Sequence, residues 1–179
     1  MNIISEDFSL SRYGIDSRLV VESDAEFILS LRTDAYHTRF IHSTDNNLEK
    51  QIEWIKKYKE REKDGKEYYF IYSKDGEPMG LSRAYNIFEY YCSSGSWLCK
   101  PNNDPKDSLA TYLMMHDVVF QNLGLDLTIF DVRKNNKKVW RLHESFGAKR
   151  IGESEIDFYF TLFKNDYFEK KRNFESFID

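Results

Sequence analysis

Apolar positions along this chain follow two different spacings, and these spacings predict most of its secondary structure. Runs such as YYFIY at 68–72 and LDLTIFDV at 125–132 are short and rich in aromatic and β-branched residues, which is typical of strands. The Asp75-Gly76 pair predicts a tight hairpin turn between two of them. In all, we predict strands at 16–22, 68–72, 78–88, 94–100, 125–132, 149–152 and 156–163.

Other segments carry apolar residues three or four positions apart, which is the spacing of a helix that buries one face. Leu48, Ile52 and Ile55 form such a stripe, and Gly65 follows it as a C-terminal stop. Ser23-Asp24 marks the start of an earlier helix. We predict helices at 25–31, 47–63, 105–122 (or beginning at 108) and 137–146, and a further helix from Asp166 onward.

The predicted order of these elements is β-α-α-β-β-β-α-β-α-β-β. Runs of antiparallel strands joined to one or two βα units are typical of an α+β fold. We therefore expect an α/β/α sandwich with a mixed, mostly antiparallel central sheet of about seven strands and about four helices. The 179 residues, of which 41% are apolar, fit a single domain over residues 1–179.

Net charge, cysteine positions and the lack of long apolar runs exclude several classes of partner and site. The net charge of -4 gives no general attraction to nucleic acid or to an anionic membrane, so neither is expected as a partner. Cys92 and Cys99 would lie on opposite faces of a strictly alternating strand, and neither a disulfide nor a metal site is expected. Because no signal-peptide pattern or spanning apolar run of about 20 residues occurs, we expect a cytoplasmic protein.

The segment from Asp131 to Gly147 carries the most chemical information. Asn136 is a good helix N-cap, and Lys137 and Lys138 fall in the first turn, where the helix dipole disfavours cations. A phosphate bound at this end would remove the conflict, because backbone N–H groups and lysines together bind anions. Without a phosphate, the two lysines are simply solvated, at a cost of about a few tenths of a kcal/mol.

This segment resembles the last conserved motif of the GCN5-related N-acetyltransferase (GNAT) family, in which a strand precedes a helix with the pattern N-x-x-small-x-x-L-Y-x-x-x-G. His143 stands where many family members have a tyrosine. The positions that match are Val132, Asn136, Val139, Leu142 and Gly147. Similar matches at 19–32, 53–55 and 79–80 extend the resemblance over 16–163, closest to ribosomal-protein N-terminal and amino-sugar nucleotide acetyltransferases.

The resemblance implies a V-shaped splay between strands 4 and 5 of the sheet, with acetyl-CoA as co-substrate in the gap. The residues that it implies for coenzyme binding are Trp97, Leu98, Cys99, Ser108, Leu109, Ala110, Thr111, Asn136, Lys138 and Val139. The family's pyrophosphate loop is poorly matched here, because only Ala110 of 105–110 fits it, and Asp104 and Asp107 add negative charge. Lys100 and Lys106 would offset that charge, and we expect the backbone N–H groups of 108–111 to remain available.

Family members act by direct attack of an amine on the thioester, without a covalent enzyme intermediate. The resemblance implies that a backbone N–H within 97–99 polarises the carbonyl and that His143 meets the departing sulfur. A histidine can donate a proton near neutral pH, although His143 equally fits an ordinary helix position packed beside Phe146. Asp131 is the first candidate for the base, with Tyr85 and Glu22 as further candidates.

The expected activity is transfer of an acetyl group to a primary amine, preferably of a small molecule such as an amino-sugar nucleotide. Acetylation of a protein N-terminus is the alternative, and a catalytically inactive CoA-binding module is another. The segment 33–47 should distinguish the acceptors, because a peptide site should be open and acidic, whereas a nucleotide-sugar site should carry basic or aromatic contacts. His37 and His42 fit a loop or substrate channel better than a metal site, and we expect a monomer or homodimer.

Overall fold

The computed structural model describes residues 1–178 and shows one eight-stranded sheet in the order β1-β2-β3-β4-β5-β6-β8-β7. The only parallel neighbours are β5 and β6, so the predicted mixed, mostly antiparallel sheet is confirmed for the described residues. The strands are β1 (Ser9–Arg12), β2 (Ile15–Leu19), β3 (Glu67–Lys74), β4 (Glu77–Tyr85), β5 (Tyr91–Cys99), β6 (Leu127–Arg133), β7 (Lys149–Glu153) and β8 (Asp157–Phe163).

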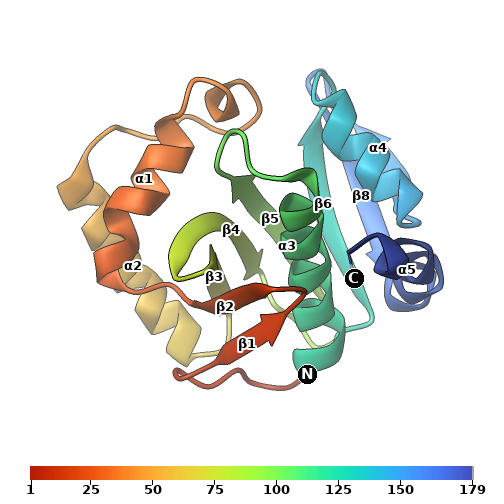
Figure 1. The fold of residues 1–179 in the computed structure, drawn as a ribbon, viewed down its shortest axis with the longest axis horizontal. Helices are drawn as coiled ribbons and strands as arrows, with labels where there is room; N and C mark the ends of the chain where they lie inside the picture. Colours follow the sequence, from red (N-terminus) through yellow and green to blue (C-terminus); the bar gives the residue numbers. More distant parts are fainter. Residues whose placement is uncertain (179) are drawn as a thin grey trace.

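Helices cover both faces of this sheet, as Figure 1 shows. They are α1 (Ala25–Thr33), α2 (Leu48–Lys63), α3 (Pro105–Asp117), α4 (Lys137–Ser145) and α5 (Lys164–Ile178). Short helical turns add η1 (Glu22–Asp24), η2 (His37–Arg39) and the π-helical η3 (Val118–Asn122), which continues α3. All predicted helices are present, and the predicted sheet lacked one strand, the polar β1.

The side chains of β3 divide between two cores, which confirms the three-layer sandwich. Tyr68, Phe70 and Tyr72 pack in the core on the α3 side, whereas Tyr69 and Ile71 pack in the core with α1 and α2. Successive strand residues point to opposite faces, so a strand that is buried on both faces is apolar at almost every position. This explains the continuous run YYFIY in the sequence.

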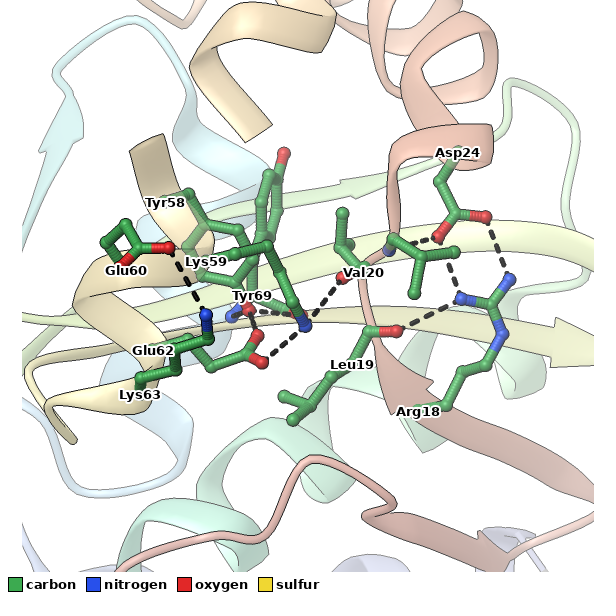
Figure 2. A network of polar contacts seen from close by, with 11 residues as sticks. Arg18, Leu19, Val20, Asp24, Tyr58, Lys59, Glu60, Glu62, Lys63 and Tyr69 are labelled. Carbon is green, nitrogen blue, oxygen red and sulfur yellow. Dashed lines mark hydrogen bonds and ion pairs between the residues drawn. The ribbon is translucent and has the colours of Figure 1, made fainter. Parts of the chain in front are cut away.

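A polar network fastens α1 and α2 to the sheet (Figure 2). Arg18 of β2 donates to both carboxylate oxygens of Asp24, at 2.8 Å each. The Tyr58 hydroxyl of α2 donates to Glu62 and accepts the backbone N–H of Tyr69 at 2.9 Å. Because buried polar groups are costly to leave unpaired, these bonds fix the two helices against β2 and β3. The start of α1 and the end of α2 are therefore held against the sheet.

Strands β5 and β6 pair only at their beginnings, from Tyr91–Leu127 to Ser93–Ile129. Beyond these pairs β5 runs on to Cys99 and β6 to Arg133 without ladder contacts between them. The splay that the family resemblance implied is therefore confirmed. It lies between the fifth and sixth strands, because β1 shifts the numbering by one.

A β-bulge interrupts the alternation of β5. In the register with β4, Leu81 pairs with Leu98 and Arg83 pairs with Gly95, so β5 contains one extra residue there. Ser96 in the bulge has a φ of 50°. The bulge overturns the expectation for the cysteines, because Cys92 and the Cys99 thiol both lie on the α3 side, the latter 3.4 Å from the Thr111 hydroxyl. Both thiols are free.

Candidate functional site

A cavity of about 770 Å³ occupies the gap between β5 and β6. Ser94–Cys99 form one wall, and Phe130–Arg133 form the opposite wall. The cavity continues past the loop before α3, past one side of α4 and past the α1–α2 connection. Its lining includes Trp97 and Leu98 from β5 and the basic Lys138 and Arg141 from α4. A pocket of this shape, with few convergent polar groups, is where a ligand is expected to bind.

Most of the side chains predicted to hold a coenzyme line this cavity. Trp97, Leu98 and Cys99 come from β5, Ser108 and Leu109 from the first turns of α3, and Asn136, Lys138 and Val139 from the start of α4. Ala110 and Thr111 are different, because both are buried and do not line the cavity. The Thr111 hydroxyl accepts a hydrogen bond from Trp97 Nε1 at 3.0 Å, so it orients the indole that does line it.

The start of α3 contradicts one prediction. The Asp104 carboxylate caps the helix by accepting the Lys106 N–H at 2.8 Å, and the Ser108 N–H donates to the Asp104 carbonyl at 3.0 Å. Since α3 begins at Pro105, the amides of 108–111 lie within the helix and donate to its carbonyls. The expectation that they remain available was therefore wrong.

The two acidic residues near this helix start are already engaged. Asp107 forms an ion pair with Lys74 of β3 at 2.8 Å, while Asp104 serves as the cap. Lys138 and Arg141 of α4 line the same cavity, whereas the Lys100 ammonium, also from the lining, lies 5.6 Å from the ring of Phe27 in α1. The two positive charges of α4 suit an anion such as a phosphate.

Asn136 occupies the N-cap position of α4, as predicted, but its side chain makes no capping hydrogen bond. Its backbone angles, φ -85° and ψ 62°, differ from the extended geometry that brings a cap side chain over the first turn. Its carbonyl instead accepts the N–H groups of Val139 and Trp140 at 3.2 Å. The Asn136 side chain therefore lines the cavity with its amide unused by the cap.

His143 lies on the buried side of α4 at the cavity wall. Its ring packs 4.2 Å from the ring of Phe130, and its Nδ1 lies 3.1 Å from the Tyr112 hydroxyl. Burial, with a smaller effect from His116, holds the pKa of His143 well below its usual value. The imidazole is therefore neutral near pH 7, which corrects the expectation that it supplies a proton there.

His37 of η2 contacts the end of β5, and the sequence analysis did not predict this contact. Lys100 N–H donates to the Met79 carbonyl, so the antiparallel alternation directs the N–H and C=O of Cys99 away from β4. The Cys99 carbonyl meets His37 Nε2 at 2.8 Å. Because a carbonyl only accepts, His37 carries its proton on Nε2. This bond joins the α1–α2 connection to the end of β5 across the cavity.

The three candidates for the base lie in different surroundings. Asp131 is exposed and lines the cavity. Tyr85 packs against Gly95, and burial followed by the nearby Asp131 charge raises its pKa. Glu22 lies in η1 beside Lys56, at 3.8 Å, and does not line the cavity. The structure thus brings Asp131 and Tyr85 together and leaves Glu22 apart from them.

No group of three or more metal-ligating side chains occurs among the residues that the structure describes. Within the same part of the chain, no helix is both long and apolar enough to cross a membrane.

Comparison with known proteins adds to this geometry. The family model described as "Acetyltransferase (GNAT) domain" matches residues 18–149. Among solved structures, FdhC, described as a nucleotide-linked sugar GNAT, is 32% identical with a TM-score of 0.84 over 97% of this chain and 99% of its own. No curated protein sequence matches.

Two more distant structures share the fold. RimJ of Mycobacterium smegmatis, solved with CoA-disulfide, is 16% identical with a TM-score of 0.73, over 88% of this chain and 86% of its own. The ribosomal-protein-S5-alanine acetyltransferase of Vibrio fischeri is 16% identical with a TM-score of 0.71, over 90% and 99% of the two chains.

Proposed function

Because this chain belongs to the GNAT acetyltransferase family, we propose that it transfers an acetyl group from acetyl-CoA to the primary amine of an amino-sugar nucleotide. The observation that carries the proposal is the gap between β5 and β6, which opens after three residue pairs into a cavity of about 770 Å³. A gap inside a sheet exposes backbone hydrogen-bonding groups along an apolar wall. Such a wall suits the amide-containing arm of a coenzyme A thioester.

The basic end of the cavity is where we place the coenzyme phosphates. Lys138 and Arg141 line it, and the start of α4 adds N–H groups that no side chain caps. This arrangement replaces the glycine-rich pyrophosphate loop that the sequence lacks. The loop of residues 100–103 borders the same end, and Asn102 adopts a positive φ of 69° there.

In the proposed reaction the neutral amine nitrogen attacks the thioester carbon, a C–N bond forms, and the C–S bond breaks with its electron pair on sulfur. The Cys99 N–H, which points away from β4, is placed to polarise the thioester carbonyl. When Tyr112 donates to Nδ1 of His143, the neutral ring carries its proton on Nε2 and can hydrogen-bond the departing thiolate. Asp131 accepts the amine proton, directly or through water.

The acceptor proposal has support on the opposite side of the cavity. The connection between α1 and α2 lines it with Tyr36, His37 and Phe40, so the wall is aromatic rather than acidic. A peptide site was expected to be open and acidic, so protein N-terminal acetylation is the less favoured candidate. FdhC, whose description names a nucleotide-linked sugar, is the more similar relative at 32% identity. An acceptor and coenzyme of this kind also fit a cytoplasmic protein.

Two measurements test the proposal. Isothermal titration should give saturable binding of acetyl-CoA, with one molecule bound for each chain. A release assay for free CoA, run against a panel of amino-sugar nucleotides, polyamines and peptides, should then give the highest kcat/KM for an amino-sugar nucleotide. Absence of acetyl-CoA binding would remove the enzymatic proposal altogether. Binding without turnover on any amine would favour the inactive coenzyme-binding module.

A further inference from the structure

A second, smaller cavity lies between the α1–α2 pair and the face of β3 and β4 that these helices cover. Its volume is about 260 Å³, and it shares no lining residue with the larger cavity. Arg32 comes from α1, Lys50 and Trp54 from α2, and Tyr69 and Arg83 from the sheet. Nothing in the proposed reaction uses these residues.

One of the three cations that line this smaller cavity has no paired carboxylate. Lys50 is paired with the lining Asp45 at 2.7 Å, and Arg83 is paired with Glu67 at 2.6 Å, which leaves Arg32. Arg32 donates from Nε to the Thr44 hydroxyl at 2.8 Å. No carboxylate of the described chain lies within 4.0 Å of its guanidinium. Arg32 therefore presents an uncompensated positive charge at the cavity wall.

A buried hydroxyl without an acceptor for its proton lies on the same wall. Tyr69 is only 2% exposed, and its O–H finds no acceptor among the described residues, since the neighbouring Arg32 side chain can only donate to it. Leaving such a group unsatisfied costs about 1–3 kcal/mol, so buried hydroxyls normally have a partner. The positive charges that act on this hydroxyl are Arg32 and Arg83, and the latter is itself paired with Glu67. One hydroxyl donor and the unpaired Arg32 thus face a single small space.

We infer that this cavity binds an oxyanion of the phosphate type. An oxyanion would accept from the Tyr69 hydroxyl and from the guanidinium of Arg32, which favours planar, paired hydrogen bonds to such groups. The ring of Trp54 lies 5.2 Å from the Arg83 guanidinium and holds that cation in place. The volume is below the ~300–1,000 Å³ of sites for whole drug-sized ligands, so it fits one anionic group of a larger molecule or a free anion.

The two cavities adjoin through Arg83 and through the α1–α2 connection. Arg83 pairs in register with Gly95, which lines the larger cavity, and its guanidinium lies 4.6 Å from the ring of Tyr85. Residues 40–41 border the larger cavity, and residues 43–45 border the smaller one. An acceptor with its amine near Asp131 could therefore extend a phosphate toward Arg32. The assignment of the anion to the acceptor rests on the proposed function, whereas binding of an oxyanion in this cavity does not.

Binding of uridine diphosphate tests the inference, with CoA kept at saturation so that the coenzyme's own phosphate site is filled. We expect Arg32→Gln and Tyr69→Phe each to weaken uridine diphosphate binding about tenfold or more. Lys57→Gln removes the same charge from the exposed side of α2 and should leave the affinity unchanged. Tyr69→Phe removes an unsatisfied hydroxyl, so the Tm without ligand should stay equal or rise, which separates lost binding from misfolding.

Kinetics then identify the source of the anion. If uridine diphosphate raises the KM of an amino-sugar nucleotide but not that of a phosphate-free amino sugar, the phosphate belongs to the acceptor. If it binds through Arg32 without affecting the acceptor KM, the cavity takes a free anion. Equal uridine diphosphate affinity in wild type, Arg32→Gln and Tyr69→Phe would overturn the inference. Release of CoA with a phosphate-free amine is measured separately. Acetyl transfer can therefore be shown even if uridine diphosphate binds equally to all three proteins.

Discussion

The hydroxyl of Tyr112 lies 3.1 Å from Nδ1 of His143, where α3 and α4 meet beside the larger cavity. Because the pKa of Tyr112 is raised well above its usual value by burial, its hydroxyl keeps its proton and donates. A neutral His143 that accepts at Nδ1 must carry hydrogen on Nε2. This pair of residues therefore sets the tautomer of the imidazole before any ligand binds.

The first prediction concerns turnover by a His143→Phe variant. Loss of one hydrogen bond to the departing sulfur should lower kcat about ten- to hundredfold and leave the Kd of acetyl-CoA nearly unchanged. Stopped-flow release of CoA and isothermal titration measure the two quantities. Lys57→Gln, on the exposed side of α2 and outside both cavities, is the control and should leave both near wild type. Wild-type kcat in His143→Phe would limit His143 to a packing role.

The pH dependence of the same variant tests the neutral state of His143. Its pKa is held well below 6.5 by burial, so the imidazole does not titrate between about pH 6 and pH 9. Any loss of activity on acidification within that range should therefore have the same midpoint in wild type and in His143→Phe. A midpoint near 6.5 that disappears only in the variant would contradict the depressed pKa.

The second prediction separates Tyr85 from Asp131. The pKa of Tyr85 is raised by burial and by Asp131, so the phenol stays protonated and acts as a donor rather than a base. Tyr85→Phe should raise the acceptor KM several-fold with little change in kcat. Asp131→Asn should lower kcat about 10²-fold or more if its carboxylate takes the amine proton. Steady-state kinetics at saturating acetyl-CoA distinguish the two, and identical changes in both variants would count against this division.

The third prediction concerns the close approach of β4 and β5 near the bulge. A Cβ added at Gly80 would lie 3.0 Å from the Leu98 carbonyl oxygen and 3.3 Å from the Cys99 sulfur. Gly80→Ala should therefore force the strands apart and lower the free energy of unfolding by about 1–3 kcal/mol. Gly152→Ala is the matched control, because its Cβ would meet Tyr159 at an ordinary 3.6 Å. Urea denaturation of both variants measures the difference, and equal losses would contradict the steric account.

The fourth prediction concerns acid stability. Burial lowers the pKa of His116 to about 4, and its Nε2 has no hydrogen-bond partner. Since the folded pKa is below the unfolded value of 6.5, this group stabilises the fold above pH 6.5, and that stability is lost as the pH falls through about 4. Between pH 6.5 and about pH 4, the unfolding free energy of wild type should therefore fall with pH. In His116→Phe this fall should be smaller by up to about 3 kcal/mol.

Urea denaturation at about pH 7 and at about pH 5 measures this effect. His143 titrates in the same direction, so the double variant should flatten the curve further. If the unfolding free energy depends on pH in His116→Phe and in the double variant as it does in wild type, neither His116 nor His143 resists protonation in the folded state.

The elements that could be predicted are those whose apolar spacing is set by burial. The buried β3 and the amphipathic α2 follow their patterns closely, because each packs against the core along its whole length. Strand β1 was missed because its residues are partly or fully exposed and carry no apolar periodicity. The splay between β5 and β6 is not encoded in spacing at all, and only the family resemblance predicted it.

The errors in the site have local physical causes. The faces of Cys92 and Cys99 were misassigned because one extra residue at the bulge near Ser96 breaks the period of two. The amides after Ser108 were misjudged because Asp104 starts the helix earlier than the family loop would. His37 could not be assigned, since its contact with the Cys99 carbonyl joins segments that are far apart in the sequence.

The two walls of the larger cavity come from separate stretches of the chain. The α1–α2 connection forms the wall proposed to hold the acceptor, whereas β5, α3 and α4 form the wall proposed to hold the thioester. The hydrogen bond from His37 to Cys99 is a direct tie between them. Under the proposed function, substitutions within residues 34–47 that keep this hydrogen bond can therefore change the amine while acetyl donation stays intact. Related proteins with this architecture can therefore differ in their acceptor while β5, α3 and α4 stay the same.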